Sequence, residues 1–317
     1  MISHLRDSDL RVSWQRLLTE AVTQPGTLHE GYTRFWNYSI GNQILAMIQC
    51  RARGLQPGPL ATFEKWKQLG RHVKKGEQAL TLCMPIILKA KEWDEKRSEN
   101  GDSAGNGENG SGPRTVFVYK NRWFVLAQTE GKEYEPQPIP EWDRDAALKA
   151  LDIQEEPFSM MDGNCQGYAT KNRKIAVSPV AVLPHKTFFH EVAHIVLGHI
   201  GDDTMTDGEK LTRSLQEVEA EAVALICCET LGLPGSEEAR GYIQHWLERK
   251  EDVSEKTAQR ILSTAAKVLQ AGVRSADRCV TGERPQMWEA FNSSQPQGES
   301  SETSVNSGHQ SVGGVEC

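Results

Sequence analysis

Three residues within FFHEVAHIVLGH, residues 188–199, have the types and the spacing that metal chemistry requires. His190 and His194 are four positions apart, so on an α-helix their imidazoles lie on one face and can bind a single ion. Glu191 projects from the same turn, beside that ion rather than onto it. This HExxH pattern is typical of zinc metallopeptidases, in which the histidines bind Zn²⁺ and the glutamate accepts a proton from the attacking water.

The same segment also fits a core helix that carries hydrogen-bonded histidines. Apolar residues surround the three polar ones and predict a buried helix over 184–200. Polar groups are costly inside such a helix unless they have partners, so two histidines and a glutamate there need an explanation. Metal binding supplies one, and we favour it while the core-helix alternative stays open.

A catalytic zinc site needs a third protein ligand and one open position. The metzincin pattern HExxHxxGxxH would supply a third histidine, but Gly198 and His199 each lie one position away from where that pattern needs them. The pattern is therefore excluded. We interpret His199 instead as a residue of the last helical turn, where a cation is favoured by the helix dipole.

The next predicted helix offers acidic candidates in SLQEVEAEAVALICCETLGLP, residues 214–234. Glu217 and Glu221 are four positions apart and share a face, whereas Glu219 points elsewhere. We assign Glu217 as the third ligand and Glu221 as the acceptor for the second ring N–H of a ligating histidine. The alternative is that these acids form a solvated face near the start of the helix.

We expect one Zn²⁺ ion in this centre, with Mn²⁺ or another divalent metal as the alternative. Peptide hydrolysis would also need a donor for the oxyanion. The sequence leaves this role open among three residues: Tyr168, His185 and His245.

The elements that must position these residues follow from the hydrophobic pattern. In the second half, short strands over 167–178 precede helices, which we predict over 184–200, 211–231, 237–248 and 253–271. In the first half, helices are predicted over 10–22, 35–53 and 63–70, and strands over 79–90 and 115–127 are predicted to be neighbours. The predicted fold class is α+β, with an N-terminal α+β domain followed by a mainly helical domain.

Three segments lack the apolar residues of packed elements. Residues 94–114 are rich in Gly, Ser and Asn and predict a flexible loop between the two strands. Residues 133–145 contain three prolines and predict a linker, and the Ser- and Gly-rich residues 276–317 predict a disordered tail. The predicted domains are therefore 1–132 and 146–275.

Composition fits a cytoplasmic protein without a membrane partner. The 317 residues exceed what one core usually serves, and 38% hydrophobic with 25% charged residues is ordinary for a globular chain. The N-terminus has no signal-peptide pattern, and no window approaches 18 consecutive apolar residues. Seven scattered cysteines without CxxC spacing are expected to be reduced.

Charge is distributed unevenly along the chain. The net charge is −7, yet residues 1–92 hold 13 Lys and Arg against 7 Asp and Glu. Five basic residues gather around Trp66, namely Lys65, Lys67, Arg71, Lys74 and Lys75. Basic side chains with an aromatic ring are typical of single-stranded DNA binding. By composition alone, a solvated charged face with a Trp in the core is the favoured interpretation.

A resemblance favours the DNA-binding interpretation. NYSIGNQ (37–43) and WKQLGRHVKKGE (66–77) resemble the N-terminal domain of ArdC-type antirestriction proteins, whose pattern is a Trp, a Gly four positions on, and Val-x-Lys-Gly-Glu. Here these are Trp66, Gly70 and residues 73–77, and FVLAQTEG (124–131) is similar to the end of that domain. HEVAH and QEVEAEAVALICCE resemble the zincin-like metallopeptidase domain that accompanies it.

The resemblance spans roughly residues 10–272. It implies a single-stranded DNA-binding domain fused to a metallopeptidase-like domain, in proteins that mobile elements such as plasmids carry to escape restriction. The loop 94–114 and the tail are additions to this plan. The expected partner is single-stranded DNA, with a protein substrate as a further candidate.

Three functions remain under consideration. The first is a DNA-binding antirestriction protein with a competent zinc peptidase centre. The second is a non-catalytic module that shields single strands and keeps a structural or vestigial metal site. The third is a regulatory protease that cleaves a repressor. Retention of Glu191 favours a catalytic centre.

Overall fold

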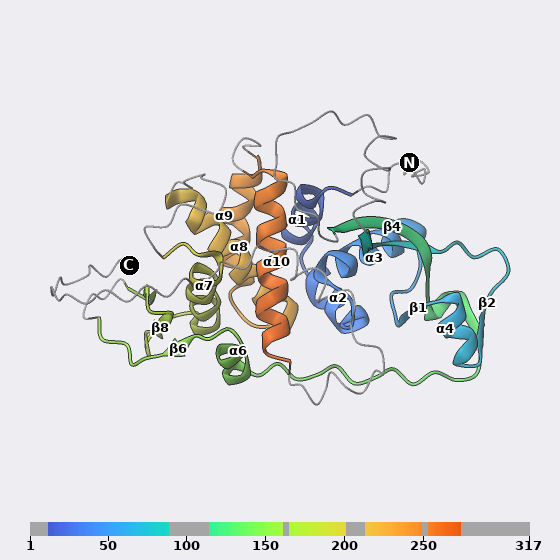
Figure 1. Ribbon diagram of the computed structural model, residues 1–317, viewed down its shortest axis with the longest axis horizontal. Coiled ribbons are helices and arrows are strands. Elements are labelled where there is room, and N and C mark those ends of the chain that lie inside the picture. The colour runs from blue at the N-terminus through green and yellow to red at the C-terminus, as the bar shows by residue number, and fades with distance from the viewer. Residues whose placement is uncertain (1–11, 89–113, 161–164, 201–212, 249–252, 274–317) are drawn as a thin grey trace.

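The computed structural model describes residues 12–88, 114–160, 165–200, 213–248 and 253–273 (Figure 1). Three helices open this part of the chain, α1 (Trp14–Thr23), α2 (Thr27–Phe35) and α3 (Ile40–Arg53). The side chain of Ser13 caps α1 and that of Ser39 caps α3, each by accepting a hydrogen bond from a backbone N–H of the first turn. These two serines therefore mark the starts of α1 and α3.

The helix that the sequence predicts over 35–53 begins at Ile40, and a separate helix, α2, precedes it. The sequence analysis missed α2, whose central Gly31 weakens the helical pattern. In the structure a Cβ at Gly31 would meet Gln43 Cβ at 3.4 Å and Met47 Cγ at 3.5 Å. The glycine therefore permits the close packing of α2 on α3 that stabilises both helices.

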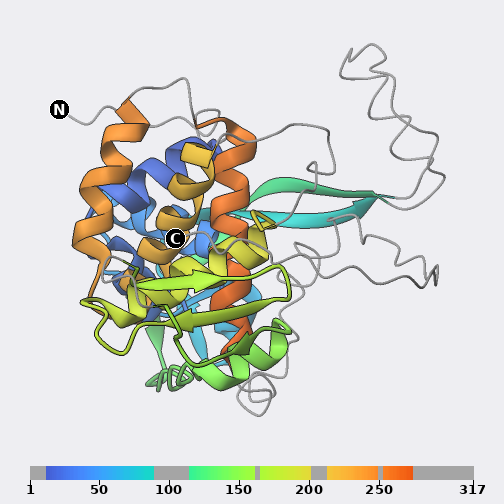
Figure 2. The same ribbon diagram turned by 90° about the vertical axis from the view of Figure 1, so that its left-hand side faces the viewer.

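A three-stranded antiparallel sheet follows, with the order β1-β4-β3. Its strands are β1 (Leu60–Thr62), β3 (Leu80–Leu88) and β4 (Arg114–Val125). The pairing of β3 with β4 confirms the predicted neighbouring strands, and both extend away from the helices in Figure 2. Next to this sheet lie α4 (Phe63–Gln68), η2 (Leu126–Gln128), and a two-stranded sheet of β2 (Arg71–Val73) and β5 (Thr129–Gly131). The three-residue strands β1, β2 and β5 were not predicted, because so short a run carries no clear alternation.

The second half contains a small sheet and five helices within the described residues. The sheet has the order β6-β8-β7, with β6 (Gln154–Glu155), β7 (Gly167–Ala169) and β8 (Lys174–Val177). The helices are α6 (Arg144–Ala150), α7 (Pro184–Leu197), α8 (Arg213–Leu231), α9 (Ser236–Glu248) and α10 (Glu255–Ala271). The sheet packs against α7, and α7 packs against α8. This arrangement confirms the α+β fold class and the four predicted C-terminal helices.

The two halves share one hydrophobic core. α1 packs against α9 and α10, α2 packs against α8, and buried residues from both halves form a single cluster. A buried ion pair supports this contact, because Glu229 of α8 pairs with Arg240 of α9 and also accepts a hydrogen bond from Leu28 N of α2. The boundary predicted at 133–145 therefore separates two segments of chain whose helices pack together.

Some of the predicted segments lie outside the described residues, and one expectation about the cysteines differs from the structure. The tail 276–317 and the loop 94–114, apart from Arg114, lie outside them. No helix in the described part of the chain is long and apolar enough to cross a membrane. Four described cysteines are free thiols: Cys50, Cys83, Cys227 and Cys228. Cys165 is disulfide-bonded, so the expectation that every cysteine is reduced is wrong there.

Candidate functional site

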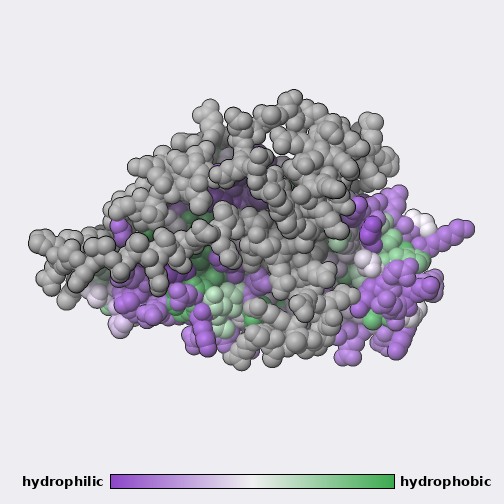
Figure 3. Space-filling view, in the orientation of Figure 1, coloured by the Kyte–Doolittle hydropathy of each residue, from purple (hydrophilic) through white to green (hydrophobic). Residues whose placement is uncertain are grey.

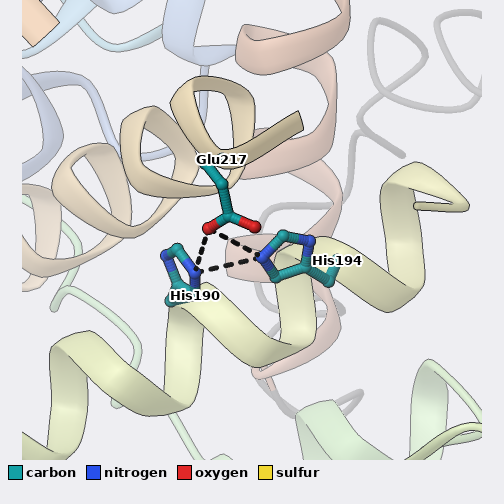
Figure 4. Close-up of side chains that lie close together, drawn as sticks. All are labelled: His190, His194 and Glu217. Carbon is teal, nitrogen blue, oxygen red and sulfur yellow. Dashed lines mark hydrogen bonds and ion pairs between the residues drawn. The ribbon is translucent and has the colours of Figure 1, made fainter. Parts of the chain in front are cut away.

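The helix α7 carries the HExxH residues and is fixed at both ends. It begins at Pro184, a residue favoured in the first turn because its missing N–H costs nothing there. It ends at Gly198, whose φ of 74° lies in the left-handed region that favours glycine. Phe188 and Phe189 are buried on the core side of α7. His190 and His194 project instead toward α8 (Figure 4).

His190, His194 and Glu217 lie close together (Figure 4). Nε2 of His190 is 3.0 Å from Nε2 of His194, and Oε2 of Glu217 is 3.3 Å and 3.7 Å from these two nitrogens. A tetrahedral site with bonds of about 2.1 Å holds neighbouring ligand atoms about 3.4 Å apart. The three separations bracket that value, so the three side chains fit a single divalent ion.

Charge also converges on this cluster. Burial lowers the pKa of His190, but hydrogen bonds with Glu217 and Glu221 outweigh it and raise the pKa to about 9. Hydrogen bonds with His190 and His194 hold the pKa of Glu217 well below its usual range. The carboxylates thus favour a positive charge at this position, which either a protonated imidazole or a metal cation supplies.

Glu221 lies on the other side of the His190 ring. Its Oε2 is 3.2 Å from Nδ1 of His190, and its Oε1 is 2.5 Å from Nζ of Lys186. Burial would raise the pKa of Glu221, but hydrogen bonds with these two groups lower it overall. The contact with His190 has the geometry that the predicted role of Glu221 requires. The sequence analysis missed Lys186, which holds this carboxylate in place.

His199 differs from the expectation of a charged residue in the last helical turn. Its side chain is only 2% exposed, and burial lowers its pKa. Nδ1 of His199 is 3.1 Å from Nδ1 of His194, and its Nε2 is 2.9 Å from Oε2 of Glu219. Glu219 is fully buried and also pairs with Arg260. These contacts could not be predicted, because residue spacing does not reveal a contact with a different helix.

Glu191 is largely buried beside the cluster. Burial raises its pKa, against the opposing effect of His190 and His194. Gly167 of β7 lies against it, since a Cβ there would stand 3.3 Å from Glu191 Cγ and 2.5 Å from Thr187 Cγ2. Because Gly167 has no side chain, the side chain of Glu191 can lie against β7.

The three candidates for an oxyanion donor differ in their surroundings. Tyr168 is buried, and its hydroxyl donates to Glu156 Oε1 at 3.3 Å and lies 3.2 Å from Ser159 Oγ. His185 is exposed in the first turn of α7. The side chain of His245 lies outside the described residues.

The basic cluster of the N-terminal half divides into a buried and an exposed part. Trp66 is only 1% exposed, its Nε1 donates to Phe124 O at 2.8 Å, and its ring packs edge-on against Tyr134. The prediction that Trp66 stacks on a base is therefore wrong for this structure, because the ring belongs to the core. Arg71 is partly buried and donates to Thr129 and to Lys132 O, which ties β2 to β5.

The remaining basic residues differ in exposure. Lys67, Lys74 and Lys75 are exposed, Lys65 is half-buried, and Lys74 Nζ donates to Ala127 O at 2.9 Å. The sequence analysis missed Phe63, which is 48% exposed at the start of α4. Phe63 and Lys67 are four positions apart and so share a face of α4. Hydrophilic side chains gather at this end of the molecule (Figure 3).

Comparisons with known proteins identify the N-terminal part of the chain. Residues 7–123 match the family model of the N-terminal domain of anti-restriction factor ArdC. No curated protein matches the chain.

Two similar solved structures are crystal structures of the antirestriction ArdC protein from the R388 plasmid. The metal-free form is 17% identical, with 89% of this chain and 99% of that chain covered and a TM-score of 0.48. The Mn(II)-bound form is 18% identical, with 83% and 98% covered and a TM-score of 0.48. Residues 7–123 of this chain therefore belong to the family of the N-terminal domain of anti-restriction factor ArdC.

Proposed function

We propose that this protein is a single-stranded DNA-binding antirestriction protein whose second half carries a divalent-metal centre for peptide hydrolysis. One observation carries the metal part, namely the convergence of His190, His194 and Glu217 with ligand atoms within 4.8 Å of one another. The match of residues 7–123 to the N-terminal domain of anti-restriction factor ArdC supports the DNA-binding part. Zn²⁺ is the ion we expect, because two imidazoles and a carboxylate with an open fourth position are typical of catalytic zinc.

Each side chain of the centre has a distinct task in this proposal. His190, His194 and Glu217 would hold the ion, and a bound divalent ion supplies Lewis acidity toward water and a carbonyl oxygen. Glu191 does not join the ligand cluster, and its burial raises its pKa, as suits a group that accepts a proton and then releases it. Glu191 would take the proton of the attacking water and deliver it to the leaving amine.

Two contacts support an ordered rather than a loosely assembled centre. Glu221 accepts from Nδ1 of His190 in the neutral ring, so the lone pair of Nε2 faces Glu217 and His194. Lys186 holds the other oxygen of Glu221. Ligands that are oriented before the ion arrives bind it more tightly, because less ordering has to accompany binding.

The DNA-binding surface we propose comprises Phe63, Lys67 and Lys75, with Lys65 and Lys74 at its edge. Exposed lysines neutralise phosphates, and an exposed ring offers a face on which a base can stack. Phe63 takes the place in this surface that the sequence analysis gave to Trp66.

The catalytic part of this proposal is tested with Glu191→Gln. This variant keeps the volume of the side chain and removes the proton acceptor, so it should bind Zn²⁺ like the wild type and cleave no peptide. Both proteins, loaded with Zn²⁺ or Mn²⁺, would be incubated with a peptide library and analysed by mass spectrometry. Equal cleavage by both proteins, or none by either, would refute a Glu191-dependent peptidase. Protection of single-stranded DNA by both proteins would then favour the non-catalytic module.

A further inference from the structure

We propose that His199, Glu219 and Arg260 form a buried positioning chain that fixes the orientation and tautomer of His194, which rests on the proposed role of His194 as a metal ligand. The chain runs from the end of α7 through α8 to α10. It meets the cluster of His190, His194 and Glu217 at the ring of His194.

The contacts of this chain are short and buried. Nδ1 of His194 is 3.1 Å from Nδ1 of His199, and Nε2 of His199 is 2.9 Å from Oε2 of Glu219. An Arg260 guanidinium nitrogen lies 3.2 Å from the same Oε2 atom. The side chains of His199 and Glu219 are 2% and 0% exposed. Oε2 of Glu219 is thus held by two partners, which fixes its arrangement, whereas Oε1 of Glu219 has no hydrogen-bond partner within the described residues.

The donors and acceptors of this chain define one tautomer of His194. A carboxylate accepts hydrogen bonds only, so Nε2 of His199 carries the hydrogen that points to Glu219. In a neutral ring, Nδ1 of His199 is then an acceptor, and Nδ1 of His194 must donate to it. Nε2 of His194 is left with its lone pair, and this atom faces Glu217 and His190. A metal ligand needs that lone pair at that position.

Arg260 completes the chain by pairing with Glu219. Its guanidinium also donates to Leu197 O at 3.2 Å, so one side chain of α10 contacts both the end of α7 and the acid on α8. A buried carboxylate is costly without a cationic partner. Arg260 supplies the partner, which lets Glu219 act on His199 as an oriented acceptor.

The turn at Gly198 brings His199 into position. Gly198 has a φ of 74° and lies directly after Leu197, the last residue of α7. The backbone N–H of His199 donates to His194 O at 2.9 Å, which folds the chain back along the helix. A glycine is suited to this turn, and the turn places His199 beside the ring of His194.

The other ligand histidine is supported in the same manner. His190 contacts Glu221, and Glu221 contacts Lys186, so an acid that is paired with a cation orients the ring. His194 has an additional histidine between its ring and the acid. The two chains start from opposite ends of the cluster and share no residue, so each can be tested separately.

Two substitutions of His199 separate its contacts. Asn places a polar atom where Nδ1 of the histidine lies and can still accept from His194, whereas Gln places one where Nε2 lies and can still donate to Glu219. Thermal unfolding of metal-free His199→Asn and His199→Gln reports any structural loss. The affinity for Zn²⁺, measured by competition with a chelating dye, reports the positioning role. Loss of an outer partner of a metal ligand typically weakens binding by about 10- to 100-fold.

We expect His199→Gln to lose about 10- to 100-fold in Zn²⁺ affinity and His199→Asn, which keeps the acceptor for His194 but loses the donor to Glu219, to lose less. A Zn²⁺ affinity of His199→Gln within a few-fold of the wild type would overturn the proposal, whatever the stability of this variant. Imidazole ¹⁵N NMR of the metal-free wild type provides a second test that needs no variant. We expect hydrogen on Nδ1 of His194 and on Nε2 of His199, and the opposite pattern would overturn the proposal. If the tautomers are as expected but no Zn²⁺ binds, the positioning chain stands and the proposed metal function fails.

Discussion

Oε2 of Glu217 lies 3.3 Å from Nε2 of His190, although the two residues belong to different helices and the side chain of Glu217 is 44% exposed. Water partly screens the attraction of a half-exposed carboxylate for a single histidine. Its approach to two imidazoles at once is better explained by a shared cation. This relationship connects α7 to α8 and is the basis of the proposed centre.

Glu217→Gln should weaken Zn²⁺ binding by more than roughly 100-fold, because a direct ligand is removed. Loss of a residue that only hydrogen-bonds to a ligand costs up to about 100-fold. Isothermal titration calorimetry measures this change. The matched control is Glu237→Gln, the same substitution at an exposed position of α9. An affinity that is reduced equally in both variants would count against Glu217 as a ligand.

Metal removal should lower the stability of the wild type. An ion that binds only the folded state stabilises it by about 4 kcal/mol at about 1,000 times its Kd. For a domain of this size that corresponds to a rise of roughly 10 °C in Tm. Differential scanning calorimetry with excess Zn²⁺ and with a chelator measures the difference. The same Tm under both conditions would mean that no ion is bound tightly by the folded protein.

Gly167→Ala should destabilise the protein by about 1 to 3 kcal/mol, because the added methyl group overpacks the space beside Glu191. Its Cβ would lie 2.5 Å from Thr187 Cγ2 and 3.0 Å from Ala176 O. Gly241→Ala is the control, since a Cβ there meets no atom within 4 Å and α9 should gain stability. Urea unfolding compares the two variants. Equal stability changes would show that the contact with Thr187 is relieved at no cost.

The DNA-binding surface predicts two different kinds of loss. Lys75→Gln should reduce the slope of log affinity against log salt for single-stranded DNA by about 1, because one phosphate contact is removed. Phe63→Ala should reduce binding by about 1 to 3 kcal/mol and leave the slope unchanged, because stacking carries no counterion release. Fluorescence anisotropy at several salt concentrations measures both effects.

Lys149→Gln, an exposed lysine of α6, is the control for these DNA measurements. It changes the net charge by the same amount as Lys75→Gln but lies in the other half of the chain. If both lysine variants shift the slope equally, the effect comes from overall charge and the surface around α4 is not the contact.

The free thiols of the N-terminal half should react slowly. Burial raises the pKa of Cys50 and of Cys83 to about 11. Because the thiolate is the reactive form, alkylation of the folded protein should rise about tenfold per pH unit from pH 7 to pH 9 and stay far below that of the urea-unfolded chain. Mass spectrometry after iodoacetamide treatment measures the rates. A folded-state rate that does not change with pH would contradict this.

Much of the frame around the candidate centre could be predicted from sequence. The helix of His190 and His194 was predictable because apolar residues repeat at helical spacing around them, and Glu217 with Glu221 was predictable as one face of the following helix. The assignment of Glu217 as a ligand stays a prediction, and the geometry gives it a specific test.

The parts that could not be predicted depend on contacts between distant segments. His199 contacts Glu219 on another helix, and Arg260 comes from a third helix. Trp66 has the composition of a stacking residue but is enclosed by Tyr134 and by the backbone at Phe124. Local pattern cannot distinguish a buried ring from an exposed one when both stand among lysines.

The metal content of the purified protein tests the central claim most directly. Inductively coupled plasma mass spectrometry would be applied to the wild type and to His194→Ala, each after exposure to equimolar Zn²⁺ and Mn²⁺ and removal of the free ions. We predict about one ion per wild-type chain and almost none in His194→Ala, with both proteins folded by circular dichroism. Equal metal content in the two proteins, or none in the wild type, would contradict the proposed centre.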